Sequence, residues 1–158
     1  MIYSIIPLTS ELAQEIITWS YDSPYDLYDH SQKDLPGLLN PEYHYHAVIG
    51  KDGALVGYCC FGLDARVPGG DYQDAEPEVL DIGVGMRPDL RGQGLGKSFV
   101  SAIEDYAIKK YSPKKTRATI AAFNQRSLKT FRSCGYQDTF QFTRDLLRIK
   151  FIQLEKPS

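Results

Sequence analysis

The sequence has little of what marks several large classes of protein. Its 158 residues include three cysteines, an odd number that cannot complete a disulfide framework, so we expect reduced thiols and a cytoplasmic location. No apolar run approaches the roughly 20 residues that span a bilayer, and Met1–Pro7 lacks the basic start and long apolar stretch of a signal peptide. The formal net charge of −2 gives no general attraction to nucleic acid. We therefore expect neither a membrane nor a nucleic acid as a partner.

The spacing of the potential metal ligands argues against a metal site. The three histidines and three cysteines form neither a C-x-x-C nor an H-x-x-x-H pattern, the spacings that place two ligands around one ion. Hydrophobic residues make up 42% and charged residues 24% of the chain, as in an ordinary globular domain. This length and composition predict one domain with one core, covering residues 1–158.

The most informative segment is the sequence RGQGLG at residues 91–96, which we call the glycine loop. It lies between a strand-like run, residues 79–86, and a helix-like run, residues 95–111. Its glycines allow a tight turn whose backbone can lie against a ligand without a Cβ in the way. The N-terminus of the following helix directs unpaired N–H groups and the positive end of its dipole at the turn. This combination predicts a cradle for a pyrophosphate.

Two common phosphate-binding motifs fit the glycine loop poorly. A Walker A motif needs a glycine where Arg91 stands, although Gly96, Lys97 and Ser98 match its second half. No later strand ends in a magnesium-binding aspartate either. The dinucleotide fingerprint G-x-G-x-x-G needs a glycine where Lys97 stands. A nucleoside triphosphatase is therefore only the third hypothesis for this chain.

A third motif, R/Q-x-x-G-x-G/A, is filled by Arg91, Gly94 and Gly96. Further along, residues 124–136 read NQRSLKTFRSCGY and match the pattern N-x-x-[AS]-x-x-x-[YF]-x-x-x-G-[FY]. One glycine-rich loop is a weak signal, but two motifs in this order are fairly specific. On these residues the chain resembles the GNAT superfamily of acetyl-CoA-dependent N-acetyltransferases, most clearly over residues 78–136.

The resemblance implies an α/β (α+β) fold with a mixed, mostly antiparallel central sheet and helices on both faces. Hydrophobic periodicity and turn signals are compatible with it. They predict helices over residues 9–19, 95–111 and 125–133. They predict strands over residues 2–7, 43–50, 54–62, 79–86, 117–122, 136–142 and 147–154, with a hairpin turn at Lys51–Gly53.

The resemblance also implies acetyl-CoA as co-substrate and a set of residues that would bind it. The backbone of Gly92–Lys97 would hold the pyrophosphate, and the strand end at Val84–Met86 would pair with the pantetheine amides and the acetyl carbonyl. Asn124 would contact the cofactor arm while capping its own helix. The full set is Val84, Gly85, Met86, Arg91, Gly92, Gln93, Gly94, Leu95, Gly96, Lys97, Asn124 and Phe131, with no metal ligand.

Phe131 is a departure from the family pattern. Many members have a tyrosine at this position, and its phenol protonates the departing thiolate. Phenylalanine cannot donate a proton, so Phe131 is expected to pack against the cofactor arm. The thiolate then leaves unassisted, which its pKa near 8.5 makes tolerable, or it takes a proton from water, Cys134 or Tyr136.

The general base must be sought among the acidic residues of the strands. Deprotonating a lysine-like amine at pH 7 costs about 4.6 kcal/mol, so a base is expected for such an acceptor. The positions where some family members have a glutamate are Thr119 and Leu80 here. Because side chains alternate along a strand, Glu78 shares the face of Leu80 and is the first candidate. Asp81, on the opposite face, is the second, and water is the alternative.

Residues 19–29, with the sequence WSYDSPYDLYD, are unusually rich in tyrosine and aspartate. If this segment is helical, Tyr21, Tyr25 and Tyr28 line one stripe and the aspartates the next. In GNAT relatives this region covers the acceptor pocket. An aromatic and acidic surface there suits a cationic amine, through cation–π contacts and ion pairing. The alternative is a packed tyrosine face beside a solvated acidic one.

Together these features predict an N-acetyltransferase in which a primary amine attacks the thioester directly, within a ternary complex. No acetyl-enzyme is expected, because Cys134 has no histidine beside it in its motif. The alternative is a non-catalytic CoA-binding sensor or subunit, which Phe131 and the unplaced base favour. The sequence leaves open the identity of the amine and whether the protein is a monomer or a homodimer.

Overall fold

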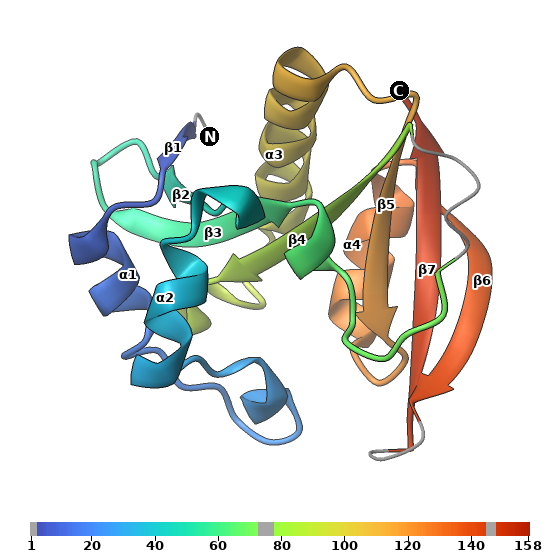
Figure 1. Ribbon diagram of the computed structural model, residues 1–158, viewed down its shortest axis with the longest axis horizontal. Coiled ribbons are helices and arrows are strands. Elements are labelled where there is room, and N and C mark those ends of the chain that lie inside the picture. Colours follow the sequence, from blue (N-terminus) through green and yellow to red (C-terminus); the bar gives the residue numbers. More distant parts are fainter. Residues whose placement is uncertain (1–2, 73–77, 145–147) are drawn as a thin grey trace.

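A computed structural model describes residues 3–72, 78–144 and 148–158 of the chain, and it contains one twisted sheet (Figure 1). The sheet has seven strands in the order β1-β2-β3-β4-β5-β7-β6. All neighbouring pairs are antiparallel except β4 and β5, which confirms the predicted mixed, mostly antiparallel sheet. The strands are β1 (Ser4–Pro7), β2 (His46–Ile49), β3 (Leu55–Phe61), β4 (Val79–Met86), β5 (Lys115–Ala121), β6 (Gln137–Arg144) and β7 (Ile149–Pro157).

Helices cover both faces of the sheet, as predicted. They are α1 (Ser10–Ile16), α2 (Leu35–Leu38), α3 (Gly96–Tyr111) and α4 (Gln125–Ser133). Single 3-10 turns occupy Tyr25–Tyr28, Gln32–Asp34, Pro41–Tyr43, Leu63–Ala65 and Pro88–Leu90. In the residues that the structure describes, no helix is both long enough and apolar enough to cross a bilayer.

Alternation along the strands divides the core between the two faces. Phe99, Ile103 and Ala107 recur at helical spacing on α3 and pack with α4 against one face of the sheet. On the other face Ile16 of α1 packs against Tyr58 of β3 and its neighbours. Because β3 supplies side chains to both clusters, it is buried along its whole length.

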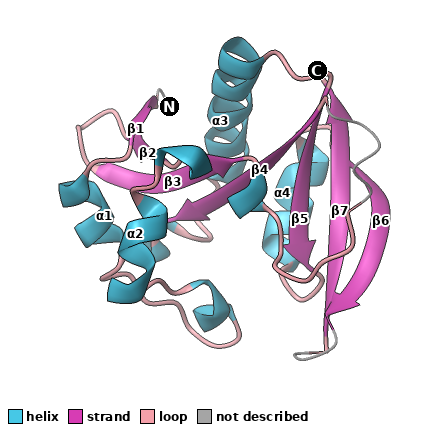
Figure 2. Cartoon of the chain, viewed as in Figure 1, coloured by secondary structure: helices cyan, strands magenta, loops and turns pink. Residues whose placement is uncertain are grey.

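The feature that positions the site is the separation of β4 from β5 (Figure 2). The two parallel strands pair only at Val79–Asp81 with Lys115–Arg117. A buried ion pair marks the last of these positions: the Arg117 guanidinium donates to both carboxylate oxygens of Asp81 at 2.6 and 2.8 Å. Beyond it the strands diverge, so β4 from Ile82 onward has β3 on one edge and, among the described residues, no strand on the other.

The tyrosine-rich segment differs from its prediction. The first helix ends at Ile16, not Trp19, and the segment that follows contains only the turn Tyr25–Tyr28. Pro24 explains part of this, because proline lacks the N–H that a helix needs and disfavours helical geometry in the residue before it. The tyrosines therefore form no helical stripe. The starts of the first and last predicted strands, residue 2 and residue 147, lie outside the described residues.

Candidate active site

A cavity of about 710 Å³ opens where β4 and β5 separate. Its lining begins at the first residue past the pairing on each strand, with Ile82 of β4 and Ala118 of β5. The glycine loop and the start of α4 line it. It is also lined by a group that we call the acidic aromatic wall, which consists of Tyr21, Tyr28, Asp29, Asp34, Tyr45, Tyr58 and Asp64.

The glycine loop has the backbone that a phosphate cradle requires. Gly92 and Gly94 have φ angles of 75° and 77°, in the left-handed region that only glycine adopts without strain. The loop leads into α3, whose N-cap, Leu95, makes no side-chain capping bond. The first N–H groups of this 16-residue helix are therefore available to an anion, which the helix dipole also attracts.

Close packing between α3 and α4 brings a second cation to the loop. A Cβ on Gly96 would lie 2.9 Å from the Thr130 hydroxyl of α4, so only glycine lets the helices approach this closely. A Cβ on Gly92 would lie 3.3 Å from Nη2 of Arg126. Arg126 thus stands beside the loop and lines the cavity, a position that no sequence motif indicated.

Most of the predicted cofactor-binding residues line this one cavity. They are Val84, Gly85, Met86, Arg91, Gly92, Gly94, Leu95, Gly96, Asn124 and Phe131. Gln93 and Lys97 do not line it. The Gln93 amide donates to the carbonyl of Asp89 at 2.7 Å, and the Lys97 side chain is exposed. Asn124 caps α4, accepting from the Ser127 N–H at 3.3 Å, as the sequence predicted.

Arg91 contacts the tyrosine-rich segment. Its guanidinium lies 4.1 Å from the centre of the Tyr25 ring and 5.5 Å from that of Tyr21. The Tyr21 hydroxyl donates to the Met86 carbonyl at 2.6 Å, and burial raises the pKa of Tyr21 to about 12. The segment is thereby fastened both to the end of β4 and to the glycine loop.

Two glycines of β4 make room for side chains of β3. Tyr58 pairs with Gly85, and a Cβ on Gly85 would lie 2.3–2.6 Å from the Tyr58 ring and hydroxyl. Cys60 pairs with Gly83 in the same way, with its sulfur 2.8 Å from a Cβ there. Burial raises the pKa of Tyr58 well above its usual value and that of Cys60 to about 12. Both groups therefore stay protonated at neutral pH.

The structure does not bring Glu78 or Asp81 to the cavity. Both precede Ile82. Asp81 lies in the part of β4 that pairs with β5, and Glu78 lies directly before β4. Glu78 is exposed and its carboxylate lies 2.9 Å from Nζ of Lys114. Asp81 is buried between Arg117 and Arg66, whose Nε lies 2.9 Å from its carboxylate. Period-two alternation assigns residues to the faces of a strand, but it contains no information on their distance from the strand separation.

The groups considered as proton donors beside Phe131 also lie elsewhere. Tyr136 packs edge-to-face on Phe131, and its hydroxyl pairs with Thr116 at 2.8 Å, in the core. Cys134 contacts the carbonyl of Lys97, outside the cavity. Tyr28 does line the cavity, at the start of α4, where its phenol oxygen accepts from the Asn124 amide at 3.5 Å. Burial raises the pKa of Tyr28, although the Asn124 hydrogen bond opposes the shift.

The carboxylates of the acidic aromatic wall are held in place by hydrogen bonds. Asp29 accepts from the Tyr21 N–H at 2.9 Å and Asp34 from the Ser31 N–H at 2.7 Å. Asp64 accepts from the Tyr45 hydroxyl. Of the aspartates predicted to form a stripe, only Asp29 lines the cavity. Among the residues that the structure describes, no group of three or more His, Cys, Asp or Glu is placed to hold a metal ion.

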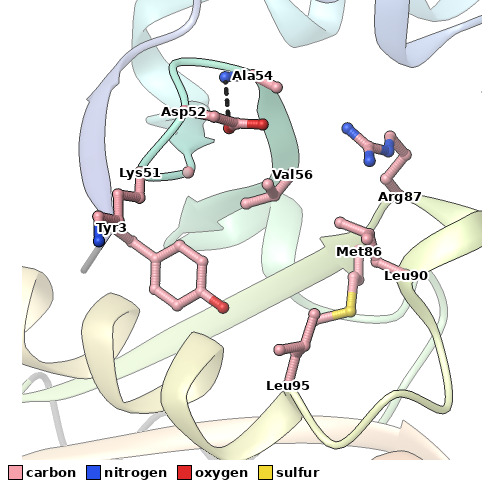
Figure 3. A pocket seen from close by; sticks show the side chains of 10 residues that line it. Tyr3, Lys51, Asp52, Ala54, Val56, Met86, Arg87, Leu90 and Leu95 are labelled. Atoms are coloured by element: carbon pink, nitrogen blue, oxygen red, sulfur yellow. Dashed lines mark hydrogen bonds between the residues drawn. The ribbon is translucent and has the colours of Figure 1, made fainter. Parts of the chain in front are cut away.

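A second cavity, of about 510 Å³, shares Met86, Leu90 and Leu95 with the first (Figure 3). Two of its charged groups, Arg87 and Asp52, make bonds within the protein. Arg87 donates to the Leu55 carbonyl and to Asp89, and Asp52 accepts from the Ala54 N–H. This cavity therefore offers a ligand less charge than the first, and we take the first as the candidate active site.

Comparison with known proteins places the chain in a family. The model of the acetyltransferase (GNAT) family matches residues 8–136, so this chain belongs to the GNAT family and is an acetyltransferase by family and fold. A comparison with curated protein sequences finds no match.

Solved structures agree on the fold at low sequence identity. A GNAT-family acetyltransferase from Bacillus anthracis has a TM-score of 0.75 and 16% identity, over 98% of this chain and 94% of that one. A chimera of the spermidine N-acetyltransferase SpeG from Vibrio cholerae with hSSAT has a TM-score of 0.74 and 13% identity, over 98% and 94%. At this identity the likeness defines the fold alone.

Proposed function

We propose that this protein transfers the acetyl group of acetyl-CoA to a primary, cationic amine. The observation that carries the proposal is the continuity of the cavity. The same cavity is lined by the glycine loop and the start of α3, with their amides, and by the acidic aromatic wall. An anionic donor and a cationic acceptor could thus meet beside the free edge of β4.

The glycine loop fits the diphosphate of CoA. Its two left-handed glycines turn the backbone around an anion, and Arg126 supplies a positive charge beside Gly92. Each N–H bond to a charged oxygen contributes about 1.5–3 kcal/mol. The amides together would therefore provide most of the affinity, and Arg126 would add attraction at the edge of the site.

The free edge of β4 fits the pantetheine arm. Val84, Gly85 and Met86 pair with β3, and past Asp81 no strand in the described ranges of the chain covers their other edge. Backbone groups on that edge can pair with the amides of an extended ligand. An N–H at this edge could also donate to the oxyanion of the tetrahedral intermediate, where single donors in other enzymes contribute about 3–4 kcal/mol.

The acceptor would lie against the acidic aromatic wall. The wall contributes three carboxylates and four tyrosines to the cavity, and carboxylates and aromatic rings attract a cation more than a neutral or anionic group. Spermidine, the substrate named for the Vibrio cholerae neighbour, is one amine of this kind and belongs in the first panel of acceptors.

Direct attack within a ternary complex is the mechanism that the thiols favour. Cys60 is the cysteine that lines the cavity, and it is buried with its pKa raised to about 12. Its thiol is therefore a poor nucleophile at neutral pH. When CoA leaves, Tyr28 would protonate its thiolate, because this phenol lines the cavity at Asn124, the residue that would contact the cofactor arm.

The proposal is tested by thermal unfolding and by release of the CoA thiol. Acetyl-CoA at 100 times its Kd should stabilise the protein by about 2.7 kcal/mol and raise its Tm. Thiol release should then depend on the amine, measured with polyamines, small amines, peptides with a free N-terminus and lysine peptides. No Tm shift at millimolar acetyl-CoA would refute the donor site. Binding without turnover on any acceptor would support the non-catalytic CoA-binding alternative.

A further inference from the structure

The side chains of Asp34, His30 and Tyr58 form a row that ends at β4. Nε2 of His30 lies 3.0 Å from the Tyr58 hydroxyl, and the two rings meet edge-to-face with their centres 5.5 Å apart. Nδ1 of His30 lies 3.7 Å from Oδ2 of Asp34. The same Asp34 oxygen accepts from the Ser31 N–H, so the carboxylate is fixed by its own turn. All three side chains line the cavity.

The inner end of this row lies beside the proposed reaction centre. Tyr58 is on β3 and pairs with Gly85, the middle residue of the strand end that would hold the acetyl group. A Cβ on Gly85 would lie 2.6 Å from the Tyr58 oxygen, so this hydroxyl sits directly over β4. An amine that approaches the thioester from the acidic aromatic wall would pass the Tyr58 hydroxyl.

We propose that His30 accepts the proton that the amine must lose, that the Tyr58 hydroxyl relays it, and that Asp34 is a positioning residue for the His30 ring. The inference rests on the proposed function and names the base that this reaction needs. The His30 side chain is 24% exposed, so it can return its proton to solvent.

One proton passes from the amine to His30 through the Tyr58 hydroxyl. The ammonium form of the acceptor gives one proton to the Tyr58 oxygen, while the Tyr58 O–H proton passes to Nε2 of His30, so Tyr58 remains neutral. The free amine attacks the thioester carbonyl, a C–N bond forms, and the C–S bond of the tetrahedral intermediate breaks. The second proton of the nitrogen leaves to solvent, and His30 releases its own there. The CoA thiolate takes one proton from Tyr28, which regains one from solvent.

Competing bases are less well placed. Glu78 and Asp81 lie outside the cavity, each with a cationic partner. His46 is buried against Tyr106, and burial lowers its pKa. Neither His44 nor His46 lines the cavity. Imidazole is the side chain that ordinarily changes charge between pH 5 and 8, so it can accept and release a proton at neutral pH more readily than a carboxylate can.

Several other groups around this row carry or can carry charge and would shape its titration. Asp34 and Asp29 come from the segment that contains His30, and Tyr21 and Tyr28 from the same segment further back along the chain. Tyr58 and Cys60 face it from β3.

The experiment compares kcat and KM from pH 5.5 to 9.5 for the wild type and the variants His30→Gln, Tyr58→Phe and the double variant. The acceptor is the best amine of the panel described above. Glutamine can keep a hydrogen bond to Tyr58 but cannot take the proton. General acid–base groups contribute about 10²–10⁴-fold, so kcat at pH 7 should fall at least about 100-fold in each single variant. In the double variant kcat should fall no further than in the single variants, because the two groups act as a unit.

The pH profile separates proton transfer from a structural role. The rate of His30→Gln should recover as pH rises toward the pKa of the free amine, and its KM for acetyl-CoA should match the wild type. His44→Asn is the matched control: this exposed histidine has a φ of 54°, which asparagine tolerates, and the profile should not change. Tm and acetyl-CoA binding show that each variant is folded.

Two results would overturn the relay alone. One is an active wild type with a His30→Gln variant of equal rate and equal pH profile. The other is a Glu78→Gln variant that loses the wild-type pH dependence of kcat while the His30→Gln variant keeps it. A wild type that binds acetyl-CoA and acetylates no amine would overturn the proposed function, and the relay with it.

Discussion

Replacing Gly94 with alanine tests the glycine loop as a phosphate cradle. At φ 77° an L-residue is strained, which costs about 1–2 kcal/mol in the free protein. No atom lies within 4 Å of the added Cβ, so no clash adds to this cost. For a domain of this size the loss lowers the Tm by roughly 2–8 °C. In the complex the methyl group would also displace the diphosphate from at least one amide, which weakens binding by about 1.5–3 kcal/mol, or roughly 10- to 150-fold.

Gly53→Ala supplies a matched control for that measurement. Gly53 lies in the β2–β3 hairpin turn at φ 84°, also with no atom within 4 Å of an added Cβ, and it does not line the candidate site. Both variants should lose similar stability in thermal unfolding, whereas only Gly94→Ala should lose affinity for acetyl-CoA in calorimetry. Equal acetyl-CoA affinity in the two variants would refute the assignment of the diphosphate to this loop.

Two further predictions concern the buried ion pair of Asp81 with Arg117 and the proposed proton donor Tyr28. Asp81→Asn leaves Arg117 buried without its charge partner and should lower the free energy of unfolding in urea by about 3–5 kcal/mol. Asp138→Asn, which breaks the exposed bidentate pair with Arg132, should lower it by less than about 1 kcal/mol, and equal losses would contradict the structural role of Asp81. Tyr28→Phe should lower kcat by about tenfold while leaving acetyl-CoA affinity unchanged, since a thiolate leaves moderately well without help. An unchanged kcat would remove Tyr28 as the proton donor to CoA.

The sequence predicted the parts of this molecule that local rules determine. The strand Val79–Met86 and the helix Gln125–Ser133 have the predicted bounds, and Asp52–Gly53 lies in the predicted hairpin turn. Each of these depends on periodicity, capping or turn chemistry within a few residues. The glycine loop belongs with them, because its positive φ angles demand glycine wherever the loop is placed.

The remaining residues of the site depend on which distant segments meet. His30 and Tyr58 are 28 positions apart and neither belongs to a motif, so their contact follows only from the path of residues 17–34 across β3. Glu78 shows the opposite case. Its place directly before a strand could be predicted, but the point where β4 leaves β5 follows from pairing between strands, which single-strand patterns do not contain.

The short pairing of β4 with β5 has a mechanical consequence. In the described part of the chain, three paired positions of β4 and β5 make the sheet continuous between the set β1-β2-β3-β4 and the set β5-β7-β6. A ligand that lies extended in the gap would act as an eighth, non-covalent strand and brace one set against the other. Acetyl-CoA should therefore slow amide hydrogen exchange on both sides of this seam, including positions that it never touches.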